Sequence, residues 1–158
     1  VYLGGSDLDA AKLLGYVNNS GTEATFTVSG TVTSDSAKEA KVTLTSTSDG
    51  AKVFTVDTAS GSYTISVPAD TYKFVVTKAA HLSYTKNALE VMADVAKSVE
   101  LKGGDTNADG TINYVDLGDV IAAYNSNTEN CDISGDGTVN YVDLGIVISN
   151  YNATAVAE

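Results

Sequence analysis

The chain contains very little cysteine and proline, and no tryptophan. Its 158 residues include one Cys, one Pro and one Met. Because Cys131 is alone, the sequence excludes an internal disulfide framework and a paired-cysteine metal site. No apolar run approaches the roughly 20 residues that a helix needs to cross a bilayer. We therefore expect no membrane insertion.

Positive charge is also scarce, and it is missing from the last part of the chain. The nine basic residues are all lysines, of which Lys102 is the last, against 20 acidic residues and a net charge of −11. Nine acidic residues lie within 103–158. A protein this acidic repels phosphate backbones, which excludes nucleic acid as a partner. A compact acidic segment without its own counter-ions is expected to recruit cations from outside.

Residues 22–101 alternate between apolar and polar side chains with the period of two that half-buried strands require. About seven short strands separated by turns predict an immunoglobulin-like β-sandwich. The expected strands are 25–32, 41–45, 53–56, 62–67, 72–77, 87–91 and 97–101. The preceding residues, 1–21, are expected to be a linker or the remnant of an upstream module.

The segment 61–72 reads GSYTISVPADTY, in which a strand runs into a proline turn and then into a strand that carries Tyr72. This segment resembles the carboxypeptidase regulatory-like and collagen-adhesin B-type sandwiches. Asp70 departs from that pattern, because the family often has glycine there. The resemblance implies a structural spacer or stabiliser rather than a catalyst.

The sequence contains an internal duplication. Residues 105–125 and 132–152 align without gaps at an offset of 27, and 14 of the 21 positions are identical. Such a repeat indicates two copies of one supersecondary unit.

Each copy opens with oxygen-bearing residues at alternate positions and glycine at position six, as calcium loops require. Isolated acidic turns would be the simpler interpretation, but a pattern matched twice argues against it. Two calcium ions are therefore expected, and because Ser134 is a poorer ligand than Asn107, the second site is expected to be weaker. The expected ligands are Asp105, Asn107, Asp109, Thr111 (through its carbonyl), Asn113 and Asp116 in the first loop, and Asp132, Ser134, Asp136, Thr138, Asn140 and Asp143 in the second.

Each loop is followed by one short helix, and no helical pattern precedes the first loop. The spacing i, i+3, i+4 and i+7 predicts one apolar face on each helix, and neither helix can bury its face alone. We therefore expect the two helices to pack on each other, and we expect residues 103–152 to be largely unfolded without calcium. The predicted faces are Leu117, Val120, Ile121 and Tyr124, and Leu144, Val147, Ile148 and Tyr151.

This pair of loop–helix units resembles the dockerin of cellulosomes. The resemblance implies a multidomain chain: an all-β X module at 22–101, then a small all-α dockerin at 102–158 with two calcium loop–helix (F-hand) repeats. It implies a secreted, non-catalytic module of the cell-surface cellulosome that is monomeric until it binds one cohesin in a calcium-dependent 1:1 complex. An X module before the dockerin favours the second dockerin type, which attaches a scaffold protein to an anchoring cohesin. The alternative is the C-terminal dockerin of a polysaccharide-degrading enzyme that binds a type I scaffold cohesin.

The resemblance also places partner contacts at loop positions ten and eleven and along the outer helix face. The Tyr-Val pair there, without any basic residue within 103–158, favours an apolar, type II interface. Packing of Tyr114 and Tyr141 between the repeats is the alternative. Because both copies carry the same pair, we hypothesise two rotated docking modes. The expected contact residues are Tyr114, Val115, Gly118, Ile121, Ala122, Tyr141, Val142, Gly145, Ile148 and Ser149.

Three other classes are weighed against this interpretation. An enzyme is disfavoured because the chain has a single histidine, His81, which is expected on a surface turn. A carbohydrate-binding module would need aromatic platforms, for which only tyrosines such as Tyr2, Tyr16 or Tyr84 are available. A calcium sensor would need a methionine-rich groove, but the only methionine, Met92, lies outside the repeats.

Overall fold

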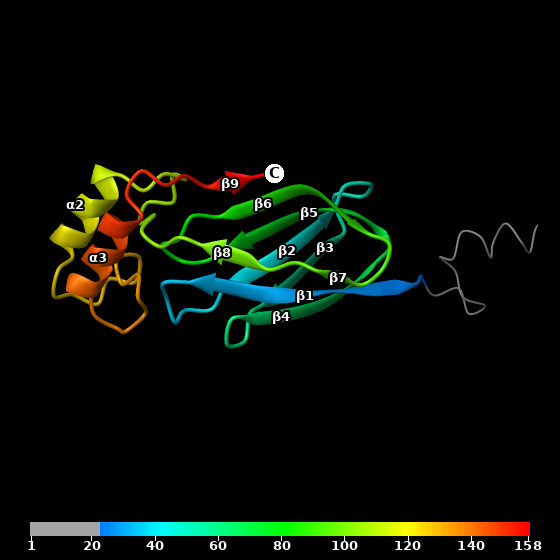
Figure 1. Ribbon diagram of the computed structural model, residues 1–158, viewed down its shortest axis with the longest axis horizontal. Helices are drawn as coiled ribbons and strands as arrows, with labels where there is room; N and C mark the ends of the chain where they lie inside the picture. The colour runs from blue at the N-terminus through cyan, green and yellow to red at the C-terminus, as the bar shows by residue number, and fades with distance from the viewer. Residues whose placement is uncertain (1–22) are drawn as a thin grey trace, which may run out of the picture.

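The computed structural model describes residues 23–158, so the segment 1–21, expected to be a linker or remnant, lies outside the described residues. A β-sandwich forms one end of the molecule, and two short helices form the other (Figure 1). No helix within 23–158 has both the length and the apolar character to span a bilayer.

The sandwich consists of two sheets, as the alternation of side chains predicts. In the first sheet β1 pairs antiparallel with β4 and parallel with β7 and β8. The second sheet has the order β3-β2-β5-β6-β9. The bounds are β1 Thr25–Ser34, β2 Lys41–Ser46, β3 Val53–Asp57, β4 Ser62–Pro68, β5 Asp70–Thr77, β6 Tyr84–Val91, β7 Val95–Ala96, β8 Val99–Leu101 and β9 Val156–Ala157.

The sandwich core lies between the two sheets and is lined by alternate residues of each strand. Val28, Val42, Leu44, Phe74 and Val76 are completely buried there. The all-β prediction for this part of the chain is confirmed.

Two of the expected strands differ in detail. β6 begins at Tyr84, three residues before the expected start. The strand expected at 97–101 is shorter, because β8 covers only 99–101; the two-residue β7 precedes it, and the chain passes over Gly30 between them. A β-carbon on Gly30 would lie only 2.0 Å from the Lys97 carbonyl oxygen, so this crossing requires glycine.

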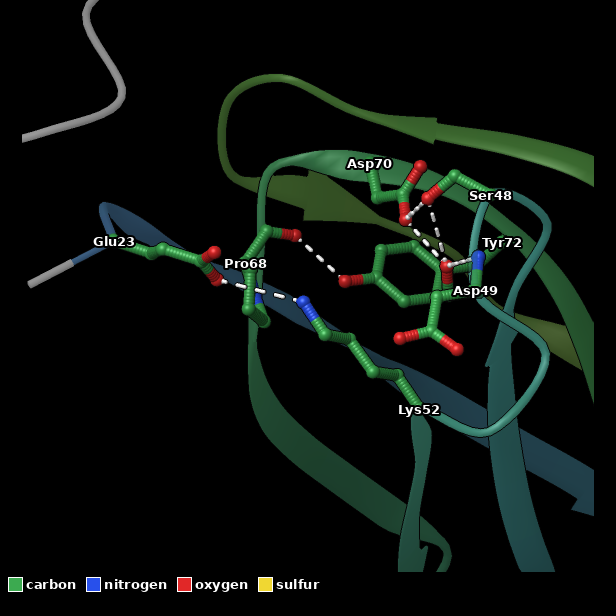
Figure 2. A network of polar contacts seen from close by, with 8 residues as sticks. Glu23, Ser48, Asp49, Lys52, Pro68, Asp70 and Tyr72 are labelled. Carbon is green, nitrogen blue, oxygen red and sulfur yellow. Dashed lines mark hydrogen bonds and ion pairs between the residues drawn. The ribbon is translucent and has the colours of Figure 1, made fainter.

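Asp70, which stands where the resembled sandwiches often have glycine, braces the end of the sandwich that is far from the helices (Figure 2). The hydroxyls of Ser46 and Ser48 both donate to its Oδ2, and they hold the pKa of this carboxyl below its usual value. Nearby, the Tyr72 hydroxyl donates to the Pro68 carbonyl at 2.7 Å. These contacts join the β2–β3 turn to the β4–β5 corner.

The helical end consists of α2 (Tyr114–Ala122) and α3 (Tyr141–Ser149). The two helices pack on each other through a second core, as predicted, with Val120 and Val147 fully buried. The predicted apolar faces are wrong in their second half, because Ile121, Tyr124, Ile148 and Tyr151 are exposed. The space that they would fill is taken instead by Ile112, Cys131, Ile133 and Val139 from the loops and the linker.

His81 lies at the junction of the two parts, and its expected place on a surface turn is wrong. It is 6% exposed, and its ring approaches Gly103, beside which Ile133 and Ile146 also pack. Nδ1 lies 2.8 Å from the Ala79 carbonyl, which can only accept, so Nδ1 carries the proton. Nε2 is buried without a hydrogen-bond partner, and burial lowers the pKa of His81 to about 4.

The C-terminal segment links the helical end back to the sandwich. Ile112 and Gly110 of the first loop bond to Ala153 and Ala155, and the chain then continues as β9 alongside β6 (Figure 1). The Glu158 carboxylate accepts from the Tyr84 hydroxyl at 2.8 Å. Residues from the predicted dockerin segment thus complete a sheet of the sandwich.

Because His81 is buried and its pKa is lowered, we expect the folded chain to lose stability in mild acid. The unfolded state gains a proton near pH 6.5 and the folded state only near pH 4, so stability is full above pH 6.5 and falls as the pH drops. The loss attributable to His81 is about 3 kcal/mol. His81→Leu should remove this part of the loss, measured by denaturant unfolding in saturating calcium between pH 7 and pH 4. Parallel pH curves for the two proteins would contradict the prediction.

Candidate cation-binding loops and helix face

The first loop turns its carboxylate and amide oxygens inward onto its own backbone. Both oxygens of Asp105 accept backbone N–H groups, from Asp109 and Gly110, each at 3.1 Å. Asn107 Oδ1 accepts from Asp109 at 2.9 Å, and Asp109 Oδ1 accepts from Thr111 at 2.9 Å. Gly110 has a φ of 85°, a left-handed conformation that favours glycine at position six. The alternate spacing therefore produces a tight loop whose side-chain oxygens face its own backbone.

The second loop repeats this arrangement with one weaker position. Gly137, with a φ of 93°, donates to Asp132 Oδ2 at 3.0 Å, and Thr138 donates to Asp136 Oδ1 at 2.9 Å. Ser134 replaces the amide of Asn107, and its hydroxyl accepts from Asp136 only at 3.4 Å. The second loop is therefore held less tightly at position three, while its other side-chain bonds match those of the first.

Loop positions nine and twelve also form the caps of the helices. Asn113 and Asp116 make a capping box on α2: Asn113 Oδ1 accepts from Val115, and Asp116 Oδ2 accepts from Asn113 N, each at 2.8 Å. Asn140 and Asp143 form the same box on α3. These interactions satisfy N–H groups that would be unpaired at the helix start. The same residues thus end the loop and begin the helix.

Sequence reasoning missed a contact that fixes position twelve. Thr106 donates to Asp116 Oδ1 through its backbone N–H at 2.9 Å and through its hydroxyl at 3.1 Å. In the second copy, Asp143 Oδ1 accepts from the Ser134 backbone N–H at 2.8 Å. It receives no hydroxyl bond there, because the residue equivalent to Thr106 is Ile133. The last carboxylate is therefore held by the residue at position two in the first loop and by the residue at position three in the second.

The loops bury negative charge without a cationic partner. Asp116 and Asp143 are 0% exposed, and Asp105 and Asp132 are also buried. Burial raises the pKa of Asp105, and the nearby charges of Asp116 and Asp109 raise it further. Within 23–158 the ion pairs all lie outside residues 103–152. This donor set fits a cation that prefers oxygen ligands.

The carboxylates of each loop do not by themselves form a compact cluster. Within the described part of the chain, no three His, Cys, Asp or Glu side chains are gathered closely enough to hold a metal ion. The predicted ligand sets mix carboxylates with other oxygens: the amides of Asn107, Asn113 and Asn140, the hydroxyl of Ser134, and the carbonyls of Thr111 and Thr138. In the structure those two carbonyls accept from Asn113 Nδ2 and Asn140 Nδ2.

The ten residues expected to contact a partner are all exposed on the helices. The two copies present nearly identical surfaces: Tyr114 and Tyr141 are 75% exposed, Val115 and Val142 39%, and Ile121 and Ile148 58%. Packing of the tyrosines between the repeats is therefore wrong. A β-carbon on Gly118 or Gly145 would meet no atom within 4 Å, and Ala122 and Ser149 are also small, so this face is open.

The structure argues against Tyr84 as a sugar-stacking residue of a carbohydrate-binding module. Tyr84 is buried, its hydroxyl donates to Glu158, and the Lys97 ammonium lies 5.0 Å from its ring centroid. Tyr84 therefore offers no free face on which a sugar could stack. The other two candidates, Tyr2 and Tyr16, lie outside the described residues.

Comparison with known proteins assigns the helical end to a family. The family described as "Dockerin type I domain" matches residues 103–152, and no curated protein matches the chain. Two structures from Acetivibrio cellulolyticus are similar in fold; they are N-terminal and C-terminal interface mutants of a type II cohesin–X–dockerin complex. For each, the TM-score is 0.64 at 24% identity, over 82% of this chain and 97% of that chain.

At this identity the likeness to the two structures concerns the fold, and the two comparisons name different dockerin types. The structural likeness extends over 82% of the chain, whereas the family match covers only the helical end. Residues 103–152 of this chain match the dockerin family, and the sandwich before them is similar in fold to the two structures.

Proposed function

We propose that this chain is a non-catalytic module that binds one cohesin in a calcium-dependent 1:1 complex and thereby assembles a cellulosome. The observation that carries the proposal is the open helix face, presented twice with the same exposures by a dockerin domain. Such a module works outside the cell or at its surface. Its role is assembly, so any polysaccharide-degrading activity belongs to other domains or partners.

Dockerin domains bind calcium in general, and here each loop holds one ion. The ligands are the oxygen donors at loop positions one, three, five, seven, nine and twelve, from Asp105 to Asp116 and from Asp132 to Asp143. The burial of four carboxylates, none of which takes part in an ion pair among the described residues, supports this assignment. When bound, calcium supplies the positive charge that residues 103–152 lack.

The cohesin contacts the exposed tyrosine, valine and isoleucine side chains at the helix starts and along the outer face. Aromatic anchors surrounded by small residues are typical of interface centres. The absence of basic side chains from 103–152 supports an apolar interface. This favours a type II cohesin and an anchoring role. The profile match to type I dockerins favours the alternative, in which the chain belongs to an enzyme that binds a scaffold.

Removal of calcium should unfold the dockerin domain while the sandwich stays folded. Ions that bind only the native state stabilise it by roughly 3–4 kcal/mol per site at 100–1,000 times the dissociation constant. Far-UV circular dichroism of the whole chain should lose its helical signal in a chelator and regain it in excess calcium. An unchanged helical signal in the chelator would contradict the prediction.

Calorimetric titration against type I and type II cohesins tests the proposed partner. We expect tight binding to a type II cohesin in calcium, and no binding in a chelator. Binding only to type I cohesins would establish the enzyme-borne alternative. Failure to bind any cohesin in calcium would overturn the proposed function.

Paired substitutions test the two rotated docking modes. If either copy can dock, Tyr114→Ala with Val115→Ala should weaken binding only about twofold, and so should Tyr141→Ala with Val142→Ala. All four substitutions together should weaken binding more than about 100-fold, as the loss of central anchors does. A severe loss from one pair alone would show a single docking mode.

A further inference from the structure

The two copies of the repeat differ where the second copy meets the sandwich. Seven of the 21 aligned positions differ. In the second copy, five of these seven residues contact the sandwich or the junction at Gly103: Ile133, Ser134, Gly135, Ile146 and Asn150. The positions that form the open helix face are mostly identical. The positions at which the two copies differ are therefore mostly those at which the second copy contacts the sandwich or the junction.

The connection between β1 and β2 supplies most of these contacts, and we call its residues 35–38 the cover segment. It lies at the end of the sandwich that faces the helices (Figure 1). Ala37 N–H donates to the Ser134 carbonyl at 3.0 Å, and Lys38 Nζ donates to the Glu129 carbonyl at 2.7 Å. Asn150 Nδ2 donates to Asp35 Oδ2 at 3.0 Å. Three of its four residues thus bond to the second repeat or the segment before it.

The cover segment is itself held firmly by the sandwich. The partly buried Lys78 ammonium donates to Ser34 Oγ at 2.7 Å and to the Ser36 carbonyl at 2.9 Å. These bonds fix both ends of the turn from which Ala37 and Lys38 reach the loop. The contacts on the second loop therefore come from an ordered part of the sandwich.

Position four of the loops shows how closely the cover segment fits. Gly135 has a φ of 79°, and the equivalent Ala108 has a φ of 59°. Since alanine occupies this position in the first loop, the loop conformation itself accepts a β-carbon. In the second loop, however, a β-carbon on Gly135 would lie 2.9 Å from Lys38 Cγ and 3.4 Å from Lys38 N. Glycine is thus required by the cover segment more than by the loop.

The second loop also has the weaker internal support at position three. Asn107 Oδ1 holds the first loop with a bond of 2.9 Å, whereas the bonds of the Ser134 hydroxyl are 3.4 Å long. The Ala37 bond fixes the backbone of the same residue from outside. Restricting a loop to its binding conformation before the ligand arrives lowers the entropic cost of binding.

We propose that the cover segment positions the second loop for calcium, so that affinity at this site depends on the sandwich. The first site does not depend on the cover segment, because the cover segment makes no such contact with residues 105–116. Ala37 and Lys38 are positioning residues: Ala37 bonds to the loop at Ser134, Lys38 bonds to Glu129 just before the loop, and neither is a ligand. The proposal rests on calcium binding in both loops, which titration of the unmodified chain tests separately.

The experiment is a calcium titration of the whole chain, followed by NMR at the amides of Gly110 and Gly137. Each amide donates to the first carboxylate of its own loop, so each reports one site. Lys38→Ala should weaken calcium binding at the second loop about fivefold to tenfold, as the loss of a hydrogen bond from a charged donor does, and leave the first loop unchanged. The matched control is Lys52→Ala, which removes the same charge at the far end of the sandwich, where Lys52 lies 3.9 Å from Glu23 (Figure 2).

A double-mutant cycle isolates the contact itself. Gly135→Ala should weaken the second site about tenfold in the unmodified chain, but no more than about twofold when Lys38 is already alanine. The backbone strain at position 135 is the same in both backgrounds, so the difference measures the clash with Lys38.

The outcomes separate the two proposals. An equal cost of Gly135→Ala in both backgrounds, or an equal effect of Lys38→Ala on both loops, would overturn the positioning role while leaving calcium binding intact. An unmodified chain that takes up no calcium would overturn both proposals.

Discussion

The arrangement of the helical end depends on buried carboxylates that have no basic side chain to neutralise them. Asp116 and Asp143 begin the helices as capping residues, close the loops and lie in the interior, so one charged group on each copy serves the fold and the site together. Isolated charges are costly to bury. Each loop, the start of its helix and the cation therefore fold together as one cooperative unit. The outward surface of the helices forms only when this unit is folded.

A duplicated unit that meets the rest of the molecule on one side cannot remain symmetric there. Ile133 and Ile146 pack at the junction, where the first copy has Thr106 and Asp119, which are hydrogen-bonded to each other. The outer helix surface has no such asymmetric neighbour, and its tyrosines, valines and isoleucines are the same in both copies. One face of the pair is thus specialised for an internal neighbour, and the other keeps the symmetry of the duplication.

Much of this could be predicted from the sequence, because the signals are local. Period-two alternation predicted the sandwich, and the spacing of oxygen-bearing residues with glycine at position six predicted the loops. The errors concern packing between segments distant in sequence. Ile121 and Ile148 have helical core spacing, but Ile112 and Val139 from the loops already fill that core. His81 stands among turn-like residues and is buried only because the second repeat covers it. The positions at which the two copies differ were the one signal in the sequence for the contact between the second repeat and the sandwich.

The pairing of β9 with β6 has a mechanical consequence. Besides its contacts with the cover segment, the helical end is joined to the sandwich at two separated points. One is the covalent chain at Lys102–Gly103, and the other is the parallel strand β9, after which the Glu158 carboxylate lies near Lys86 and Lys97. A single tether would act as a hinge and let the two parts rotate. Two separated attachments close a ring and remove that rotation, so the helix face keeps a fixed direction relative to the long axis of the sandwich.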